Sequence, residues 1–311
     1  MARIGTSDLD VLPLNLGGNV FGWTADGPTS VAVLDAFVAG GGSFIDTADV
    51  YSQWVEGHAG GESEAIIGDW MASRGNRADV VVATKVGQAA ARPGTSRAAV
   101  RAGIEGSLRR LRTDYVDLYY AHVDDQGTPL EETVAALGEV VAEGKARYVA
   151  ASNFTADRLA EALRIADDLG VARFVALQPH YNLVHRDEYE GALADLAVRE
   201  DLGVLPYWSL ASGFLTGKYR DGGPTVDSQR AGGALRYLDD RGRRVLAALD
   251  EVAAGRSTSV TAVALAWLRS RPGVVAPIAS ARTAAQLPDL LAGARLDLAA
   301  DELAALTAAS A

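Results

Sequence analysis

Short apolar segments alternate along the chain with longer segments whose apolar residues recur at three- and four-residue spacing. The short segments are rich in β-branched and aromatic residues, which is typical of β-strands. In one of the long segments, Val100, Ile104, Leu108 and Leu111 fall on one face of a helix. The pattern predicts strands at 12–16, 43–46, 79–85, 114–122, 146–152, 173–178, 203–207 and 273–278. It predicts helices at 96–111, 129–144, 155–170 and 187–203.

The order of these elements predicts the fold class. The strands lack the two-residue alternation of a sheet with one wet face, which indicates parallel strands covered by helices. Eight consecutive βα units favour an α/β fold of the (β/α)8 TIM barrel type. No linker or charge block divides the chain, so we expect one domain over residues 1–311. In segment 3–11 a polar turn separates two short apolar pieces, which predicts an N-terminal β-hairpin that caps the bottom of the barrel.

Composition and charge narrow the possible functions. A formal charge of −11 and a pI near 4.9 argue against nucleic-acid or anionic-membrane partners, because both require a basic surface. The absence of cysteine excludes disulfides and thiolate chemistry. The start of the chain lacks the apolar core of a signal peptide, and no apolar run approaches the length of a membrane span. We therefore expect a cytoplasmic protein.

Polar side chains lie where the predicted strands end, and in a barrel these ends build the active site. Any one of them has an ordinary explanation, such as a lysine that reaches solvent or a structural histidine. Their gathering on one face of the barrel predicts a functional site. The residues are Asp46, Tyr51, Lys85, His122, Ser152, Asn153, Gln178, Tyr207 and Arg282.

Four of these residues suggest a reaction. A tyrosine hydroxyl is a weak proton donor, with a pKa of about 10 in water. A nearby cation such as Lys85 lowers this pKa and makes Tyr51 a better general acid, and Asp46 could serve as the counter-ion that a buried lysine requires. His122 could orient a substrate oxygen. Because no side chain here can deliver an electron pair to the substrate, a reduced nicotinamide is the natural partner.

Two other classes of function remain open on these residues. His122, Asp124 and Asp125, in the segment "HVDD", could bind a divalent metal ion in a hydrolytic barrel, although such sites usually need further strand-end ligands. The chain could also be a non-catalytic module that binds NADP and regulates a partner. An intact set of the four reactive residues does not by itself prove turnover.

The chain resembles the aldo-keto reductase superfamily over nearly its whole length. The matching segments are "FIDTADVY", "GGESEAIIG", "VVVATKVG", "DYVDLYYAHVDD", "GKARYVAASNF", "LQPHYNLVHRDEYE" and "SGFLTGKY". The resemblance implies a (β/α)8 barrel that uses NADPH, without a metal, to reduce aldehydes or ketones. It implies that Tyr51 is the proton donor, that Lys85 and Asp46 tune it, and that His122 orients the carbonyl. Some potassium-channel β subunits share this resemblance and act as regulatory partners.

The resemblance also implies cofactor contacts. Ser152, Asn153 and Gln178 match residues that hold the nicotinamide carboxamide, and Tyr207 matches the aromatic residue that stacks on the nicotinamide ring. Segment 210–218 matches the loop over the pyrophosphate, and its candidate residues are Leu210, Ser212, Gly213, Leu215, Gly217 and Lys218. Segment 277–287 supplies Ser280, Arg282 and Gln286 near adenosine, where Arg282 would pair with the 2′-phosphate and favour NADP over NAD.

The sequence departs from the family pattern in three places. Trp208 and Ser209 replace a usual Ser-Pro pair, Ser280 replaces a usual glycine, and Leu290 replaces the asparagine usual for the adenine contact. Leu290 leaves the strength of NADP preference open. Phe21, Trp23 and Trp54 are the candidates for the walls of the substrate pocket. The carbonyl substrate, the physiological direction and the oligomeric state are not readable from the sequence.

Overall fold

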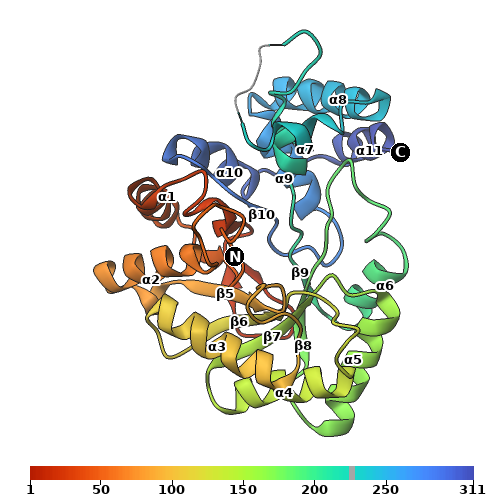
Figure 1. Cartoon of the computed structure of the whole chain (residues 1–311). Coiled ribbons are helices and arrows are strands. Elements are labelled where there is room, and N and C mark those ends of the chain that lie inside the picture. Colours follow the sequence, from red (N-terminus) through yellow and green to blue (C-terminus); the bar gives the residue numbers. More distant parts are fainter. Residues whose placement is uncertain (224–227) are drawn as a thin grey trace.

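The computed structural model describes residues 1–223 and 228–311 as a barrel of parallel strands surrounded by helices (Figure 1). The sheet order is β10-β3-β4-β5-β6-β7-β8-β9, with every neighbouring pair parallel. The strands are β3 (Asn15–Gly17), β4 (Phe44–Asp46), β5 (Val81–Val86), β6 (Val116–Ala121), β7 (Ala146–Ser152), β8 (Phe174–Gln178), β9 (Gly203–Val204) and β10 (Ile278–Ala279). The predicted (β/α)8 barrel is confirmed.

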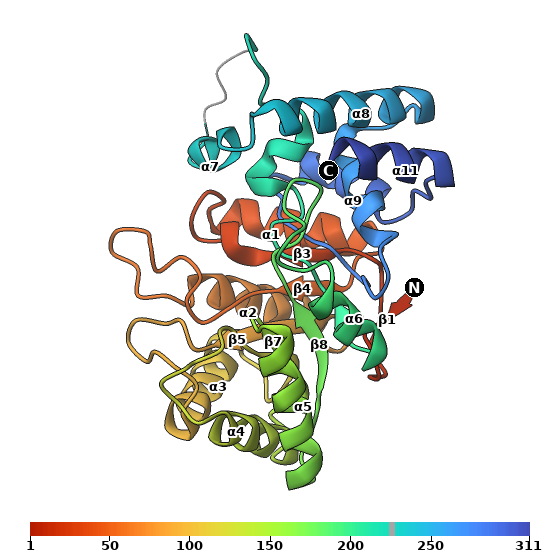
Figure 2. The same ribbon diagram turned by 90° about the vertical axis from the view of Figure 1, so that its right-hand side faces the viewer.

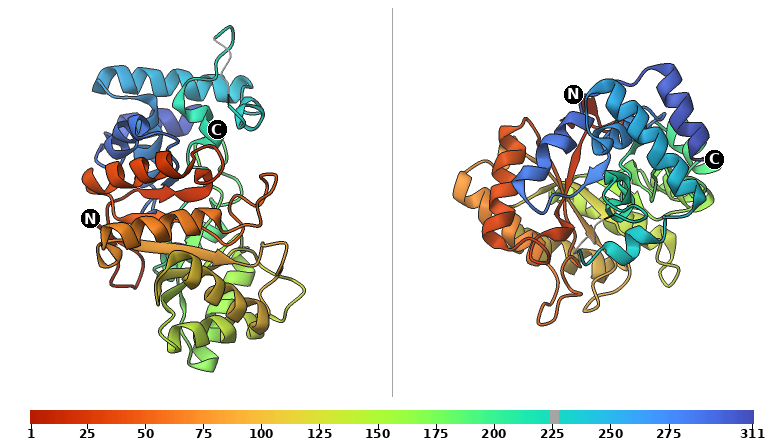
Figure 3. Two further views of the ribbon diagram at one scale, coloured as in Figure 1. Left: turned by 60° about the vertical axis from the view of Figure 1, so that its left-hand side comes forward. Right: turned by 90° about the horizontal axis from the view of Figure 1, so that it is seen from above.

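Helices cover the outside of the sheet, as the view from above shows (Figure 3). The α-helices are α1 (Gly27–Ala39), α2 (Glu62–Arg74), α3 (Arg97–Leu111), α4 (Leu130–Ala142), α5 (Ala156–Leu169), α6 (Ala192–Arg199), α7 (Ala231–Leu235), α8 (Asp240–Arg256), α9 (Val260–Arg269), α10 (Leu287–Gly293) and α11 (Ala300–Ala309). Short 3-10 helices are η1 (Gly18–Val20), η2 (Arg77–Asp79), η3 (Ala211–Thr216) and η4 (Ala284–Gln286). Within the described residues, no helix is both long and apolar enough to span a bilayer.

Hydrogen bonds close the barrel between β9 and the segment that leads into β10, the two strands at the ends of the sheet order. The amide of Val204 donates to the carbonyl of Gly273 (2.8 Å), and that of Val275 donates to the carbonyl of Val204 (2.9 Å). The amide of Ile278 donates to the carbonyl of Pro206 (2.8 Å). A sheet closed in this way brings the carboxyl ends of all its strands to one mouth.

Three strands that contain a proline are shorter than predicted. The predicted strands 12–16, 203–207 and 273–278 contain Pro13, Pro206 and Pro277, and the corresponding elements are β3, β9 and β10. Proline has no N–H to donate to the neighbouring strand, so the ladder is interrupted at each of them. The predicted helix 187–203 shortens to α6, which begins after Gly191 at a φ of 95°.

The predicted N-terminal hairpin is present and packs under the barrel. Strands β1 (Ala2–Arg3) and β2 (Asp10–Val11) pair antiparallel (Figure 2). Ile4, Leu9 and Val11 are buried with the apolar side chains of the barrel interior, such as Phe44. The hairpin therefore closes the bottom of the barrel and leaves the opposite mouth as the place for a site.

Candidate active site

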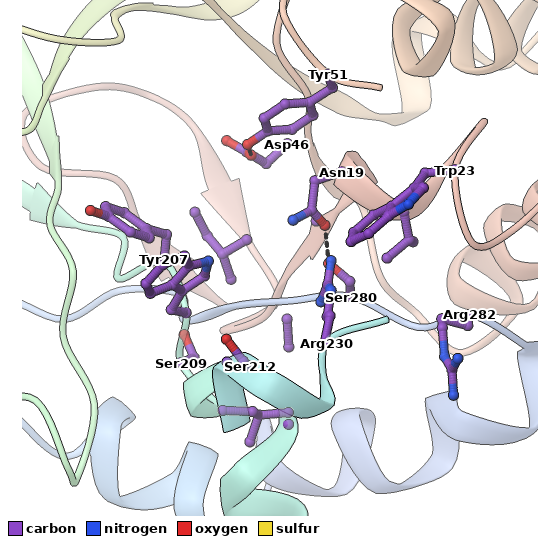
Figure 4. A pocket seen from close by; sticks show the side chains of 18 of the residues that line it. Asn19, Trp23, Asp46, Tyr51, Tyr207, Ser209, Ser212, Arg230, Ser280 and Arg282 are labelled. Carbon is purple, nitrogen blue, oxygen red and sulfur yellow. Dashed lines mark hydrogen bonds between the residues drawn. The ribbon is translucent and has the colours of Figure 1, made fainter. Parts of the chain in front are cut away.

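A cavity of about 880 Å³ opens at the carboxyl ends of the strands (Figure 4). Asp46 ends β4, Ser152 ends β7 and Gln178 ends β8, while Tyr207 and Arg282 follow β9 and β10. Most of the predicted site residues line this cavity. They are Trp23, Asp46, Tyr51, Trp54, His122, Ser152, Asn153, Gln178, Tyr207, Leu210, Ser212, Gly213, Lys218, Ser280, Arg282 and Gln286.

Four predicted residues do not line the cavity. Lys85 is fully buried behind Tyr51, where it contacts that residue rather than open space. Leu215 packs in the hydrophobic core and Gly217 ends η3. Phe21 was predicted to form a wall of the substrate pocket, but its side chain is fully buried in the core between the barrel and its helices. Burial in the core stabilises the Phe21 ring more than a place on the cavity wall would, because it removes the apolar ring completely from water.

Lys85 joins Asp46 and Tyr51 into one reactive unit, in which Lys85 and Asp46 are buried and Tyr51 is partly buried at the cavity wall. Its ammonium donates to Asp46 Oδ2 (2.6 Å), to the carbonyl of Thr47 (2.7 Å) and to the hydroxyl of Tyr51 (2.9 Å). The Tyr51 hydroxyl lies 3.2 Å from Asp46 Oδ2 and can donate to it. All three protons of the ammonium therefore have acceptors, which is what a lysine without solvent requires.

The electrostatics of Tyr51 differ from the expectation drawn from the sequence. We expected Lys85 to lower the pKa of Tyr51, but burial raises that pKa well above its ordinary value and the charge of Asp46 raises it further. Burial is the main cause, and Asp46 adds to it because it lies against both groups and offsets the charge of Lys85. Tyr51 is consequently a fully protonated hydroxyl at neutral pH that also accepts a hydrogen bond from a cation.

His122 lies beside Tyr51 and is uncharged. The two ring centroids are 6.2 Å apart and the planes meet at 71°. Burial, and secondarily the charge of Lys85, hold the pKa of His122 well below its usual range. Its Nδ1 is buried and has no hydrogen-bond partner in the described part of the chain. A buried N–H without an acceptor is costlier than an unused lone pair, which favours the tautomer with its proton on Nε2.

A chain of hydrogen bonds connects four residues that were predicted to hold a nicotinamide. The hydroxyl of Tyr207 donates to Asn153 Oδ1 (2.8 Å), and Asn153 Nδ2 donates to Ser152 Oγ (3.1 Å) and to the carbonyl of His122 (2.9 Å). Ser152 Oγ donates to the carbonyl of Gln178 (3.0 Å). Gln178 Nε2 donates to Asp46 Oδ1 (3.0 Å). The residues predicted to hold the nicotinamide are therefore connected by hydrogen bonds to Asp46 of the reactive unit.

The cavity is electropositive although the protein is acidic. Lys218, Arg230, Arg236 and Arg282 line it. Among the lining residues that the structure describes, the acids are Asp46, which Lys85 neutralises, and Asp289. Such an excess of cations suits a ligand that carries several negative charges.

Arg230 and Arg236 were not among the predicted site residues. Arg230 is one of the cavity residues labelled in Figure 4, and its guanidinium carbon is 5.3 Å from the ring of Trp23. Its Nη2 is buried without a hydrogen-bond partner within residues 1–223 and 228–311. Neither arginine follows a strand, so the rule that places polar strand-end residues in the site does not identify them. The only indication in the sequence is the number of cationic residues in and after segment 210–218.

Aromatic rings form the wall beside Tyr51. Trp23 and Trp54 meet edge to face at 5.6 Å, and Trp54 lies 6.2 Å from the Tyr51 ring. Trp54 is half exposed, so a ligand can cover it. Both tryptophans line the cavity, and their role as walls of a substrate pocket stays a prediction.

The segment "HVDD" does not assemble a metal site. Asp124 pairs with Arg158 (2.9 Å), and Asp125 accepts hydrogen bonds from the amide and hydroxyl of two threonines, Thr95 and Thr128. Both carboxylates are used in loop structure. In the described part of the chain their oxygens do not converge with the His122 nitrogens as three ligands of one ion.

Asp49, which shares the segment "FIDTADVY" with Asp46, is buried close to Glu64. Burial and the charge of Glu64 raise the pKa of Asp49 to about 7. Its Oδ1 has no hydrogen-bond partner among the described residues. The carboxylate of Glu64 accepts hydrogen bonds from the hydroxyl of Thr84 (2.5 Å) and from Nε of Arg110 (2.6 Å). Asp49 is therefore a source of pH-dependent instability rather than a member of the reactive unit.

We expect Asp49→Asn to flatten the dependence of stability on pH. Because the pKa of Asp49 is raised on folding, the folded state binds a proton more tightly, and stability falls as pH rises from about 5 through 7. The parent should lose about 2 kcal/mol more than the variant over this interval. Urea unfolding at pH 5 and pH 8 measures the difference. Parallel losses in parent and variant would contradict the burial assignment.

Comparisons with known proteins agree with this geometry. A sequence model described as "Aldo/keto reductase family" matches residues 13–311. The chain is 37% identical over 289 residues to a "Probable voltage-gated potassium channel subunit beta" of Oryza sativa subsp. japonica, covering 90% of this chain and 86% of the relative. It is 31% identical to "Protein tas" of Escherichia coli (98% and 96% covered) and 33% identical to "Norsolorinic acid reductase B" of Aspergillus parasiticus (96% and 81% covered).

The family match extends over the whole barrel, from the first barrel strand to the C-terminus. The relatives with names that denote reductases share this coverage, and the resemblance drawn from the sequence motifs is confirmed. The chain belongs to the aldo/keto reductase family.

Proposed function

We propose that this protein is an NADPH-dependent reductase of aldehydes or ketones. The observation that carries the proposal is the contact of one buried ammonium, that of Lys85, with both the Tyr51 hydroxyl and Asp46 on the wall of an electropositive cavity. A hydroxyl that accepts a hydrogen bond from a cation can release its proton to a substrate oxygen. The cavity beside it has room for a dinucleotide and a small carbonyl compound.

The cavity residues fit NADP(H). The hydroxyl and amide groups of Ser152, Asn153 and Gln178 suit a carboxamide, and the face of Tyr207 suits a nicotinamide ring. Arg230 has a buried, unpartnered Nη2 among the described residues, and we assign it with Lys218 to the pyrophosphate. Arg282 lies at the other end of the cavity from Tyr207 (Figure 4), where we assign it to the 2′-phosphate.

The chain's own residues would act on the carbonyl oxygen. When bound, the reduced nicotinamide supplies the hydride that goes to the carbonyl carbon. Tyr51 donates its proton to the oxygen, and the N–H of Lys85 stabilises the phenolate as it forms. Asp46 keeps Lys85 charged and in place. Neutral His122 can direct Nε2–H to the same oxygen and orient it.

The proposal is tested by following NADPH absorbance with a panel of aliphatic, aromatic and quinone-like carbonyl compounds, with NADH in parallel. We expect substrate-dependent oxidation of NADPH and formation of the alcohol. Tight NADPH binding without turnover above a Tyr51→Phe control would refute the catalytic role.

A non-catalytic regulatory role is the second candidate, because relatives from rice and Arabidopsis thaliana are named probable potassium-channel β subunits. The reactive unit of Asp46, Tyr51 and Lys85 is complete, which favours catalysis. The same assay separates the two functions. A regulatory module would bind NADPH tightly and leave every carbonyl compound in the panel unreduced.

Arg282→Ala should weaken NADPH binding by about ten- to a hundredfold, because a charge-assisted contact to a phosphate is worth about 1.5–3 kcal/mol. NADH lacks the 2′-phosphate, so its affinity should change by less than about twofold. Titration of each cofactor by quenching of tryptophan fluorescence measures both constants. Arg164→Ala, on the exposed face of α5, is the matched control. Equal losses for the two cofactors would contradict the 2′-phosphate assignment.

A further inference from the structure

The segment that follows β8 folds back on itself and brings two histidines together. The amide of Asn182 donates to the carbonyl of His185 (3.1 Å), and the amide of His185 donates back to the carbonyl of Asn182 (3.0 Å). The turn is fixed by Asn182 Oδ1, which accepts a hydrogen bond from the amide of Val184 (2.9 Å). As a result the imidazole of His185 lies on that of His180, with ring centroids 3.5 Å apart and planes within 13°.

The same stack continues to Tyr207. The His180 and Tyr207 rings lie 5.4 Å apart with planes within 18° of each other. Their backbones are also joined, because the amide of Tyr207 donates to the carbonyl of Pro179 (2.9 Å). Parallel, offset rings at this separation attract one another. His185, His180 and Tyr207 therefore form a three-ring stack whose last member lines the cavity.

His180 is held uncharged within the stack. The amide group of Asn182 is oriented by its contact with Val184, so its Nδ2 faces the carbonyl of Trp208 (3.0 Å) and His180 Nε2 (3.5 Å). A nitrogen that faces an NH2 group is an acceptor, so this position of His180 carries no proton. Burial, together with the neighbouring His185 and Arg236, lowers the pKa of His180 to about 3.

The arrangement does not suit a metal ion. Donor atoms of His180, His185 and Glu188 lie within 4.8 Å of one another. A histidine binds a metal through a lone pair in the plane of its ring, and the two ring planes here are parallel. Two lone pairs in parallel, stacked planes do not point at one ion, so stacking is the function that the geometry supports.

We propose that His180, backed by His185, is a positioning residue that holds Tyr207 flat as the platform for the nicotinamide ring of the cofactor. Tyr207 is fixed at its edge by the hydrogen bond to Asn153 (2.8 Å) and at its back by His180, so the face toward the cavity stays free. A platform fixed before binding does not have to be ordered by the ligand, which strengthens binding. This inference rests on the proposed NADPH function.

The test measures binding of two ligands that differ in the nicotinamide half. NADPH carries the nicotinamide, and adenosine 2′,5′-bisphosphate carries the adenosine phosphates without it. His180→Ala should weaken NADPH by about five- to tenfold, the size expected for a lost aromatic pair, and leave the bisphosphate within about twofold. His180→Phe restores a ring and should bind NADPH as the parent does. His180→Leu fills the volume without a ring face and should behave like His180→Ala.

A second readout reports the nicotinamide environment directly. The circular dichroism induced in the absorption band of bound NADPH should shrink in His180→Ala and His180→Leu and return in His180→Phe. His58→Ala, in the loop before α2 and outside the cavity, is the histidine control and should change neither quantity. Comparing His180→Leu with His180→Phe keeps the test decisive if His180→Ala does not fold.

The outcomes separate this inference from the function on which it rests. A parent protein that binds neither ligand would overturn the proposed function itself. A parent that binds both, with NADPH bound equally by the leucine and phenylalanine variants, would overturn the stacking role alone. Equal weakening of NADPH and the bisphosphate would also overturn it, since the nicotinamide half would then not be the part affected.

Discussion

Tyr51→Phe is expected to lower kcat for carbonyl reduction by about a hundred- to ten-thousandfold, the usual contribution of a positioned general acid. The dissociation constant for NADPH should stay within about twofold of the parent value. The variant removes one oxygen atom, the one that lies 2.9 Å from Lys85 Nζ and 3.2 Å from Asp46. Single-turnover reduction and fluorescence titration measure the two constants separately.

The physical reason for this separation is where the hydroxyl acts. Binding of the cofactor is assigned to Ser152, Gln178 and Tyr207 and to the arginines of the cavity, none of which contacts the Tyr51 hydroxyl by a hydrogen bond. An interaction made only in the transition state changes kcat and leaves ground-state binding alone. Tyr51 keeps its proton at neutral pH, because burial and Asp46 raise its pKa. The hydroxyl is therefore ready to donate without a prior protonation step.

Tyr189→Phe is the control for this experiment. It removes a tyrosine hydroxyl that is buried outside the cavity and, unlike that of Tyr51, has no hydrogen-bond partner among the described residues. Its turnover should match that of the parent. A fall in NADPH affinity of Tyr51→Phe with turnover preserved would be incompatible with a proton donor at this position.

The location of the site followed from the sequence because it depends on a rule of the fold. Asp46 and Gln178 end strands, and the carboxyl ends of parallel strands meet at one mouth whatever the details of packing. The polar residue at each strand end could thus be assigned to one site before the structure was known. The confirmed hairpin 3–11 followed in the same way, from a local turn between apolar pieces.

Features that depend on tertiary packing did not follow from the sequence. Phe21 and Trp23 are aromatic residues two positions apart, yet Phe21 is buried in the core while Trp23 lines the cavity. Arg230 reaches the cavity from a segment with no strand. The pKa of Tyr51 was predicted with the wrong sign, because the balance between Lys85, Asp46 and burial is set by distances that residue types do not contain.

Lys85→Met is expected to lower the free energy of unfolding by about 3–5 kcal/mol, the range measured when one partner of a buried ion pair is removed. Lys85 is fully buried, and Asp46 is 1% exposed. Without the ammonium, Asp46 Oδ2 loses its cation and the carbonyl of Thr47 loses its donor. Urea unfolding monitored by tryptophan fluorescence gives the free energy. Lys218→Met, at a lysine of the cavity that is partly exposed, should change it by less than about 0.5 kcal/mol.

Removing the partner as well shows whether the loss comes from the unpaired charge. Asp46→Asn keeps the shape of the side chain and retains an acceptor for Gln178 on a neutral group. The double variant Lys85→Met with Asp46→Asn should recover at least about half of the lost stability, because no charge is then left buried. Losses that simply add would mean that the two residues are not energetically coupled, in conflict with their 2.6 Å contact.

Activity should not recover with stability in the double variant. The neutral pair restores the fold but offers no N–H cation to the Tyr51 hydroxyl, so the phenolate that forms on proton transfer is left in a buried place without a compensating charge. A double variant that is stable and still inactive would show that Lys85 serves the reaction and that the ion pair is not there for folding alone. A double variant with parent-like turnover would instead assign Lys85 and Asp46 to structure and leave Tyr51 to act without them.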